Sequence, residues 1–202
     1  MTDAIDAIAQ KIRALEEELE VEVAKQRAGL RYGLEHGKVL FEEEVARRHR
    51  QLRTGLARYL ANARPLVVLS APVIYSLIIP FAVVDAWVSL YQAVCFRVYR
   101  IPQVQRSRYM VFDRAGLPYL NALEKLNCAY CSYVNGVIAY VREVAARTEQ
   151  YWCPIKHARR VLGAHARYLD FAQYGEGEDY RRKLETLRTK LAKEPRQPPD
   201  RL

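Results

Sequence analysis

Residues 66–96 form a run of 31 residues in which Asp85 is the only charged side chain. A helix needs about 20 apolar residues to cross the hydrocarbon core of a bilayer. The run is therefore long enough to span a membrane once, with tilt. The alternative is that it forms the buried central hairpin of a soluble helical bundle. We expect membrane contact.

Two prolines, Pro72 and Pro80, lie inside the apolar run. Pro80 divides it into halves 66–79 and 81–96, each about 21–24 Å long as a helix. Such halves are short for two full spans but suit a shallow hairpin that enters and leaves the bilayer on one side. We therefore expect a Pro-broken membrane hairpin, with one kinked span as the alternative.

Arginines flank the apolar run on both sides. Residues 45–64 contain six arginines and no acidic residue, and residues 97–114 contain five arginines and one aspartate. Positive charge is retained on the cytoplasmic side of membranes, and a hairpin keeps both clusters there. The sequence thus predicts a protein on the cytoplasmic side of a membrane, with an anionic lipid bilayer as its partner.

Two further interpretations concern the charged residues. Asp85 is a functional candidate if it lies in lipid, but it can equally cap a half-helix or pair with a flanking arginine. The arginines and tyrosines of residues 97–119 would also suit a single-stranded nucleic acid. Because no nucleic-acid motif accompanies them, a soluble nucleic-acid-binding protein is a disfavoured alternative.

The N-terminal region predicts a helical arm. Apolar residues recur at spacings of three and four, which marks one face of a helix; they are Ile5, Ile8, Ile12, Leu15 and Leu19. We expect residues 4–63 to form one long helix with a weak middle, or a helical hairpin turning near Gly37. A coiled-coil arm of this kind would mediate homo-oligomerisation or binding of a protein partner.

The remaining chain also predicts helices. Apolar periodicity covers residues 119–150, where Asn135 and Gly136 either interrupt the helix or allow another backbone to approach closely. Further helices are expected over 154–173 and 178–193. The fold class is all-α with antiparallel C-terminal helices, in four parts: an arm (1–64), a membrane-associated segment with basic flanks (65–114), a helical domain (115–193) and a disordered tail (194–202).

Four residues resemble a metal-ligand set: Cys128, Cys131, Cys153 and His157. On a helix, Cys128 and Cys131 share one face at i,i+3, and Cys153 and His157 share one face at i,i+4. Three thiolates and one imidazole form a closed tetrahedral Zn²⁺ site, and the alternative cofactor is an iron–sulfur cluster. Both pairs can bind one metal ion only if the helix breaks near Asn135-Gly136, the chain returns, or a second subunit contributes one pair. An unbroken helix carries the first pair away from the second.

The metal site and the apolar run together favour a membrane-anchored, cytoplasm-facing accessory or scaffold protein with a structural metal site. A membrane-bound iron–sulfur redox protein is the alternative. The same residues also allow a redox dithiol at Cys128 and Cys131 or a reactive Cys153 beside His157. No phosphate loop or hydrolase motif occurs, so whether the protein is an enzyme stays open, and a non-enzymatic role is favoured.

Overall fold

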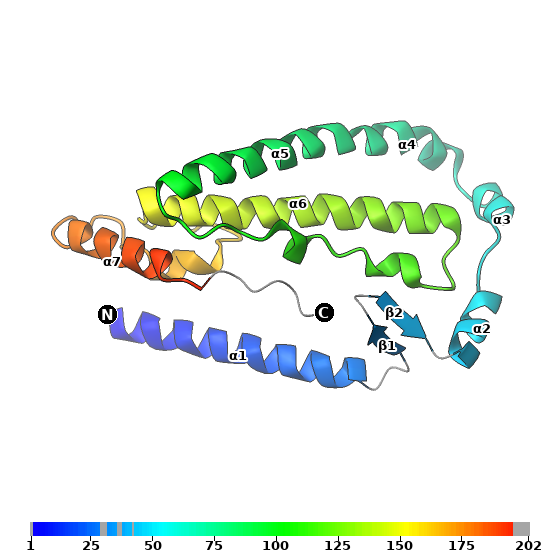
Figure 1. Ribbon diagram of the computed structural model, residues 1–202, viewed down its shortest axis with the longest axis horizontal. Helices are drawn as coiled ribbons and strands as arrows, with labels where there is room; N and C mark the ends of the chain where they lie inside the picture. Colours follow the sequence, from blue (N-terminus) through cyan, green and yellow to red (C-terminus); the bar gives the residue numbers. More distant parts are fainter. Residues whose placement is uncertain (1, 29–31, 36–37, 42, 196–202) are drawn as a thin grey trace. The chain divides into compact units, whose positions relative to one another are not determined.

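Helices make up most of the chain, which confirms the all-α class (Figure 1). The computed structural model describes residues 2–28, 32–35, 38–41 and 43–195. The chain divides into two compact units, Met1–Leu52 and Arg53–Leu202. Residues 65–114 and most of 115–193 therefore belong to one unit, because the segment after the apolar run packs on the helix that follows it.

The first unit does not contain one long helix over residues 4–63. Helix α1 covers Thr2–Ala28, and strands β1 (Tyr32–Glu35) and β2 (Lys38–Phe41) pair antiparallel before helix α2 (Glu43–Gln51). The predicted turn near Gly37 lies outside the described residues.

The apolar run does not reverse at Pro80. In the second unit, helix α3 (Leu56–Ala61) is followed by α4 (Pro65–Ser76), α5 (Ile78–Tyr91) and a π-helix (Gln92–Phe96). The last three form one helix, Pro65–Phe96. Pro80 lies in the first turn of α5, where a missing N–H costs little. The expected hairpin is therefore wrong, and the prolines only disturb the helix locally.

The helix ends in a Schellman motif. The N–H of Ile101 bonds to the carbonyl of Phe96 at 2.8 Å, and the N–H of Arg100 bonds to that of Arg97 at 3.3 Å. Arg100 takes the left-handed conformation, with φ 57°, as the residue after a helix commonly does. The chain then turns into residues 97–121, here named the return segment, which includes two short 3₁₀ helices (Arg106–Tyr109 and Asp113–Gly116).

The return segment runs back beside helix α6 (Ala122–Trp152), so that α5 and α6 are parallel (Figure 1). Side-chain hydrogen bonds between the long helix Pro65–Phe96 and α6 advance in the same direction along both; the pairs are Tyr75–Asn127, Asp85–Tyr133, Ser89–Tyr140 and Tyr91–Thr148. The antiparallel order expected for the C-terminal helices does not extend to the pair of α5 and α6. A segment that returns the full length of the helices replaces the tight turn that antiparallel packing would need.

Helix α6 is unbroken through Asn135 and Gly136. Asn121 and Glu124 form a capping box at its start, which satisfies two backbone donors. Of the two roles predicted for Gly136, the structure has the close approach, because the backbone of Tyr109 in the return segment lies against it. Helix α6 therefore provides a continuous surface on which the rest of the unit packs.

The prediction of a helix over 154–173 is wrong. The chain there is irregular, with a bridge between Ile155 and Ala172 and one 3₁₀ helix (Ala166–Asp170). Pro154 removes a backbone donor, and Gly163 adopts a left-handed φ of 68°. Helix α7 (Tyr180–Ala192) then packs on the end of α6, where Gln150 donates to the Leu187 carbonyl and Arg188 donates to that of Tyr151.

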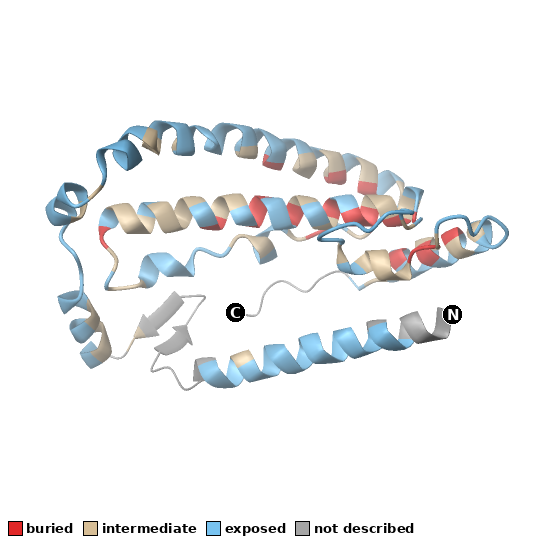
Figure 2. Cartoon of the chain, turned by 180° about the vertical axis from the view of Figure 1, so that it is seen from behind, coloured by how far each residue is buried: buried red, intermediate tan, exposed pale blue. Residues whose placement is uncertain are grey.

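The buried core of the second unit lies where α5, the return segment, α6 and α7 meet. It contains Phe96, Ile101, Val104, Tyr140, Val144 and Leu191. Figure 2 places the buried positions on the facing sides of these elements, whereas α4 is almost entirely exposed. The outer side of the long helix is therefore an apolar surface that none of the described residues of this unit covers.

Candidate functional site: an apolar helix and the groove beside it

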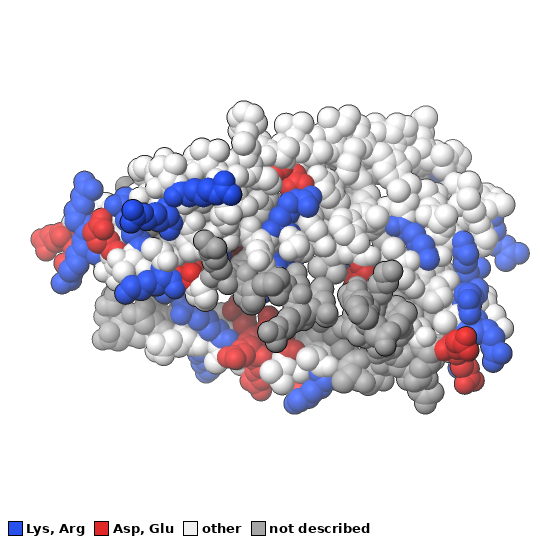
Figure 3. Space-filling model, in the orientation of Figure 1, with Lys and Arg blue, Asp and Glu red and all other residues white. Residues whose placement is uncertain are grey.

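The long helix Pro65–Phe96 is long and apolar enough to cross a membrane, and no residue of its most apolar 18-residue window is buried. Leu66 and Leu69 on α4 are 78% and 75% exposed, and Trp87 on α5 is 71% exposed. On the face seen in Figure 3, the edge formed by α4 and α5 is almost free of charge. Soluble monomers rarely expose a contiguous apolar surface of this kind, which marks an interaction site.

Asp85 pairs with an arginine of the return segment. Its carboxylate accepts from Arg106 Nε at 2.8 Å and Nη2 at 2.6 Å, and Tyr133 on α6 donates to it at 3.0 Å. Burial and the Asp85 carboxylate raise the pKa of the Tyr133 phenol, which keeps its proton in place for this bond. Of the roles considered for Asp85, pairing with a flanking arginine is confirmed.

Gln92, the first residue of the π-helix, also links the long helix to the return segment and to α6. The π-helix turns its side chain inward, where it donates to the Val104 carbonyl at 3.1 Å and accepts from the Val104 N–H at 3.0 Å. It also donates to the Tyr140 hydroxyl at 2.6 Å. Gln92 thus provides hydrogen-bond partners for both the N–H and the carbonyl of the buried Val104, as a neighbouring β-strand would.

Four charged residues form a network nearer the C-terminal end of α6. Arg167 bonds to Glu143 at 2.7 Å and to Glu194 at 2.6 Å, and the buried Arg147 bonds to Glu143 at 2.8 Å. Burial alone would raise the pKa of Glu143, but hydrogen bonds from Arg167 and Arg147 outweigh it and lower that pKa. Glu194 belongs to the predicted tail 194–202, of which residues 196–202 lie outside the described residues.

The four predicted metal ligands fall into two separate places. Cys128 and Cys131 lie in the first third of α6, whereas Cys153 caps its end and His157 follows in the irregular chain. Because α6 is unbroken, Cys131 and Cys153 are about 33 Å apart along the helix. Within the described residues, no group of three or more His, Cys, Asp or Glu side chains is placed to hold a metal ion.

The thiols themselves are free. Partial burial and the Glu149 carboxylate raise the pKa of the Cys153 thiol, which disfavours the thiolate that metal binding and nucleophilic attack both require. A zinc or iron–sulfur site built from these residues would need a second copy of the chain, which was one of the three conditions that the spacing imposed.

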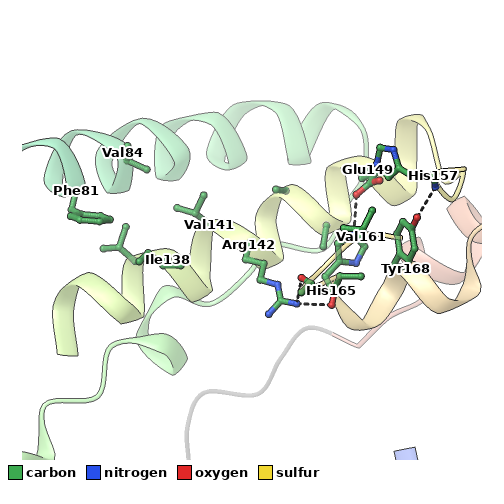
Figure 4. Close-up of a pocket in the computed structure, with 15 residues that line it drawn as sticks. Phe81, Val84, Ile138, Val141, Arg142, Glu149, His157, Val161, His165 and Tyr168 are labelled. Atoms are coloured by element: carbon green, nitrogen blue, oxygen red, sulfur yellow. Dashed lines mark hydrogen bonds and ion pairs between the residues drawn. The ribbon is translucent and has the colours of Figure 1, made fainter. Parts of the chain in front are cut away.

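A groove of about 490 Å³ lies between α5, α6 and the irregular chain after α6 (Figure 4). Its apolar part is formed by Phe81 and Val84 of α5 with Ile138 and Val141 of α6. Small-molecule sites usually have volumes of about 300–1,000 Å³ and a mostly apolar lining. The sequence did not predict this groove, because its walls are distant in the chain and meet only through the parallel packing of α5 and α6.

Polar groups gather at the other end of the groove, around residues 157–168 (Figure 4). His165 pairs with Glu149 at 2.9 Å, and its ring packs against Tyr168 and Phe171. Arg142 donates from Nη2 to the carbonyls of Gly163 and Ala164 at 3.0 and 2.7 Å. These contacts anchor the irregular chain on α6 and thereby shape the groove.

His157 has a place in this groove in addition to its predicted role as a ligand. Its backbone N–H donates to the Tyr168 hydroxyl at 2.6 Å, and its exposed ring stacks on that of Tyr168. The surrounding sequence is basic, with Lys156, Arg159 and Arg160 beside His157. Of these three, none lines the groove, where Arg142 is the permanently cationic side chain among the described lining residues.

A scan against known protein families and searches of curated proteins and of solved structures found no match to this chain. The features that bear on function are therefore the exposed helix, the return segment and the groove.

Proposed function

We propose that this protein is a membrane-bound scaffold whose helix Pro65–Phe96 lies in the plane of a bilayer surface. The parallel packing of α5 on α6 carries the proposal, because it requires a return segment along the whole length of the pair. That segment contains five arginines. It packs on the side of α5 that holds Asp85, away from the exposed apolar side.

An in-plane helix fits these charges better than a span. If Pro65–Phe96 crossed the bilayer, the return segment beside it would cross too, together with Arg106 and Arg108. Insertion scales assign about 2.5–3.5 kcal/mol to each arginine at the centre of a bilayer. With the helix in the interface, its outer face enters the acyl region and the return segment stays in water.

Exposed arginines at both ends of the helix support binding to anionic lipid. Arg58 and Arg64 precede it, and Arg97 and Arg100 follow it. Each basic residue near an anionic surface contributes about 1 kcal/mol of attraction. Because anionic lipids enrich the cytoplasmic leaflet, both clusters would lie on the cytoplasmic side, as the sequence predicts.

The scaffold part of the proposal depends on α1. Ile8, Ile12, Leu15 and Leu19 of its apolar stripe are all exposed, and the side chain of Ile5 lies outside the described residues. An amphipathic helix gains most of its stability from packing, so this stripe favours a second copy or a protein partner. The proposal includes no metal site, since α6 separates the two pairs of ligands.

Vesicle flotation tests membrane binding. Full-length protein should float with vesicles that contain phosphatidylserine and float less with pure phosphatidylcholine. Burying one leucine contributes about 1.5–3 kcal/mol, so L66Q/L69Q should weaken binding by at least about tenfold. The control is V21Q on α1, at a residue that is 51% exposed and outside the apolar stripe, and it should float like the wild type. Full flotation of L66Q/L69Q would refute the proposal.

Thiol labelling distinguishes the in-plane helix from a span. Single cysteines at R58C and R100C, in a background without native cysteines, should both react with a membrane-impermeant maleimide added outside vesicles. A protein that spans the bilayer would label at one position only until the vesicles are opened. That second result would exclude the in-plane helix.

A further inference from the structure

We infer that the groove between α5, α6 and residues 157–168 binds one long-chain carboxylate, that is, a free fatty acid taken from the bilayer. The inference rests on the proposed function, because the bilayer supplies the ligand. The hydrocarbon chain would lie against Phe81, Val84, Ile138 and Val141, and the carboxylate would lie at the polar end.

The groove continues the exposed apolar face of the long helix. Val84 lines the groove and is 41% exposed, and Ile138 opposite it on α6 is 49% exposed. An acyl chain in the interface therefore reaches the groove without crossing a polar surface. The volume of about 490 Å³ lies in the lower half of the range for small-molecule sites, which favours a ligand with a single chain.

Charge at the polar end selects the head group. Arg142 and His157 line the groove. Lys156, Arg159 and Arg160 are close to His157 in the chain but are not lining residues. The one acidic lining residue, Glu149, is paired with His165. Of the Arg142 donors, Nη2 bonds to two backbone carbonyls, and a carboxylate is an ordinary acceptor for the others. A neutral head group would accept the same hydrogen bond without the attraction between charges, and a cationic head group would be repelled.

Fluorescence titration with cis-parinarate, a naturally fluorescent fatty acid, tests this inference. The full-length protein is kept in a fluorinated surfactant, whose chains mix poorly with hydrocarbon. We expect saturable binding of one parinarate per chain. Oleate should displace it, whereas oleyl alcohol should displace it much less. Equal displacement by the alcohol would refute the role of the basic end, and binding without saturation would refute the site.

Two matched tryptophan variants locate the ligand. Ala145 is exposed and lines the groove, so A145W fills the groove without entering the core. Ala139 on the same helix is exposed and is not a lining residue. A misfit in an apolar pocket lowers affinity by about 10–200-fold, so A145W should lose parinarate binding to that extent and A139W should retain it. Equal affinities of the two variants would overturn the assignment.

The same variants separate this inference from the proposed function. A145W should still float with anionic vesicles, since α4 is intact, and L66Q/L69Q should still bind parinarate. Parinarate binding by a protein that does not float would leave the groove assigned and the membrane scaffold refuted. Flotation without saturable parinarate binding would support the membrane scaffold and refute the groove as a fatty-acid site.

Discussion

Gly136 of α6 lies directly against the backbone of Tyr109 in the return segment. A Cβ atom at this position would overlap the Tyr109 carbonyl oxygen and lie 2.8 Å from Met110 Sδ. The parallel arrangement of α5 and α6 depends on this approach, because the return segment has to lie close to both helices along their length. Adding a single methyl group at Gly136 therefore tests how the return segment packs on α6.

The variant G136A should destabilise the second unit. Overpacking costs about 1–3 kcal/mol, which outweighs the gain of about 1 kcal/mol in helix propensity. Chemical denaturation monitored by circular dichroism measures the change. The control is G55A, because Gly55 has a φ of −60° and no atom lies within 4 Å of an added Cβ. Equal stability of G136A and the wild type would contradict the close approach.

Removing the charge of Asp85 should loosen the return segment. D85N keeps the shape of the side chain but loses the two-point ion pair with Arg106. Because Arg106 is 45% exposed, we expect a loss of only about 1–2 kcal/mol in the free energy of unfolding. Hydrogen exchange should increase around residues 104–109 before global unfolding. The exposed D113N in the same segment serves as the control.

Stability should fall in acid because of Glu143. Its pKa is lowered from the ordinary 4.5, so its pairing stabilises the fold fully above about pH 4.5. That contribution is lost as the pH falls through the lower pKa of the folded state. E143Q should be less stable at neutral pH and less sensitive to pH below 4.5. E185Q, whose pair with Arg188 is largely exposed, should behave like the wild type.

The separation of the cysteines leads to a prediction about zinc. If α6 is unbroken, C131S should have the same zinc content and the same denaturation midpoint as the wild type, measured by mass spectrometry and circular dichroism. A structural Cys₃His site would behave differently, since metal binding there is folding free energy. Loss of one zinc per chain in C131S would mean that a second subunit completes the site.

Self-association should depend on the apolar stripe of α1. Replacing Ile12 and Leu19 with asparagine removes two apolar contacts per chain, and we expect the mass measured by light scattering to fall toward that of one chain. E17Q/E20Q changes exposed polar residues on the same helix and should leave the mass unchanged. An unchanged mass for I12N/L19N would exclude α1 as the interface.

The amino-acid pattern by itself determined helices α6 and α7 and the apolar surface. Periodicity placed α6 and α7 within a few residues, and the single charge in residues 66–96 identified the exposed helix. These features are local, because helix hydrogen bonds and apolar repeats span only a few positions. The basic flanks likewise follow from composition alone.

Only the tertiary structure decided how these helices are joined. The sequence suggested a reversal at Pro80 and a meeting of Cys131 with Cys153, but a proline in the first turn of a helix does not reverse it. The parallel order of α5 and α6, and with it the groove, depends on contacts between residues about 50 positions apart, such as Asp85 with Tyr133. No local pattern encodes such contacts, because they depend on which surfaces fit together once the whole unit has packed.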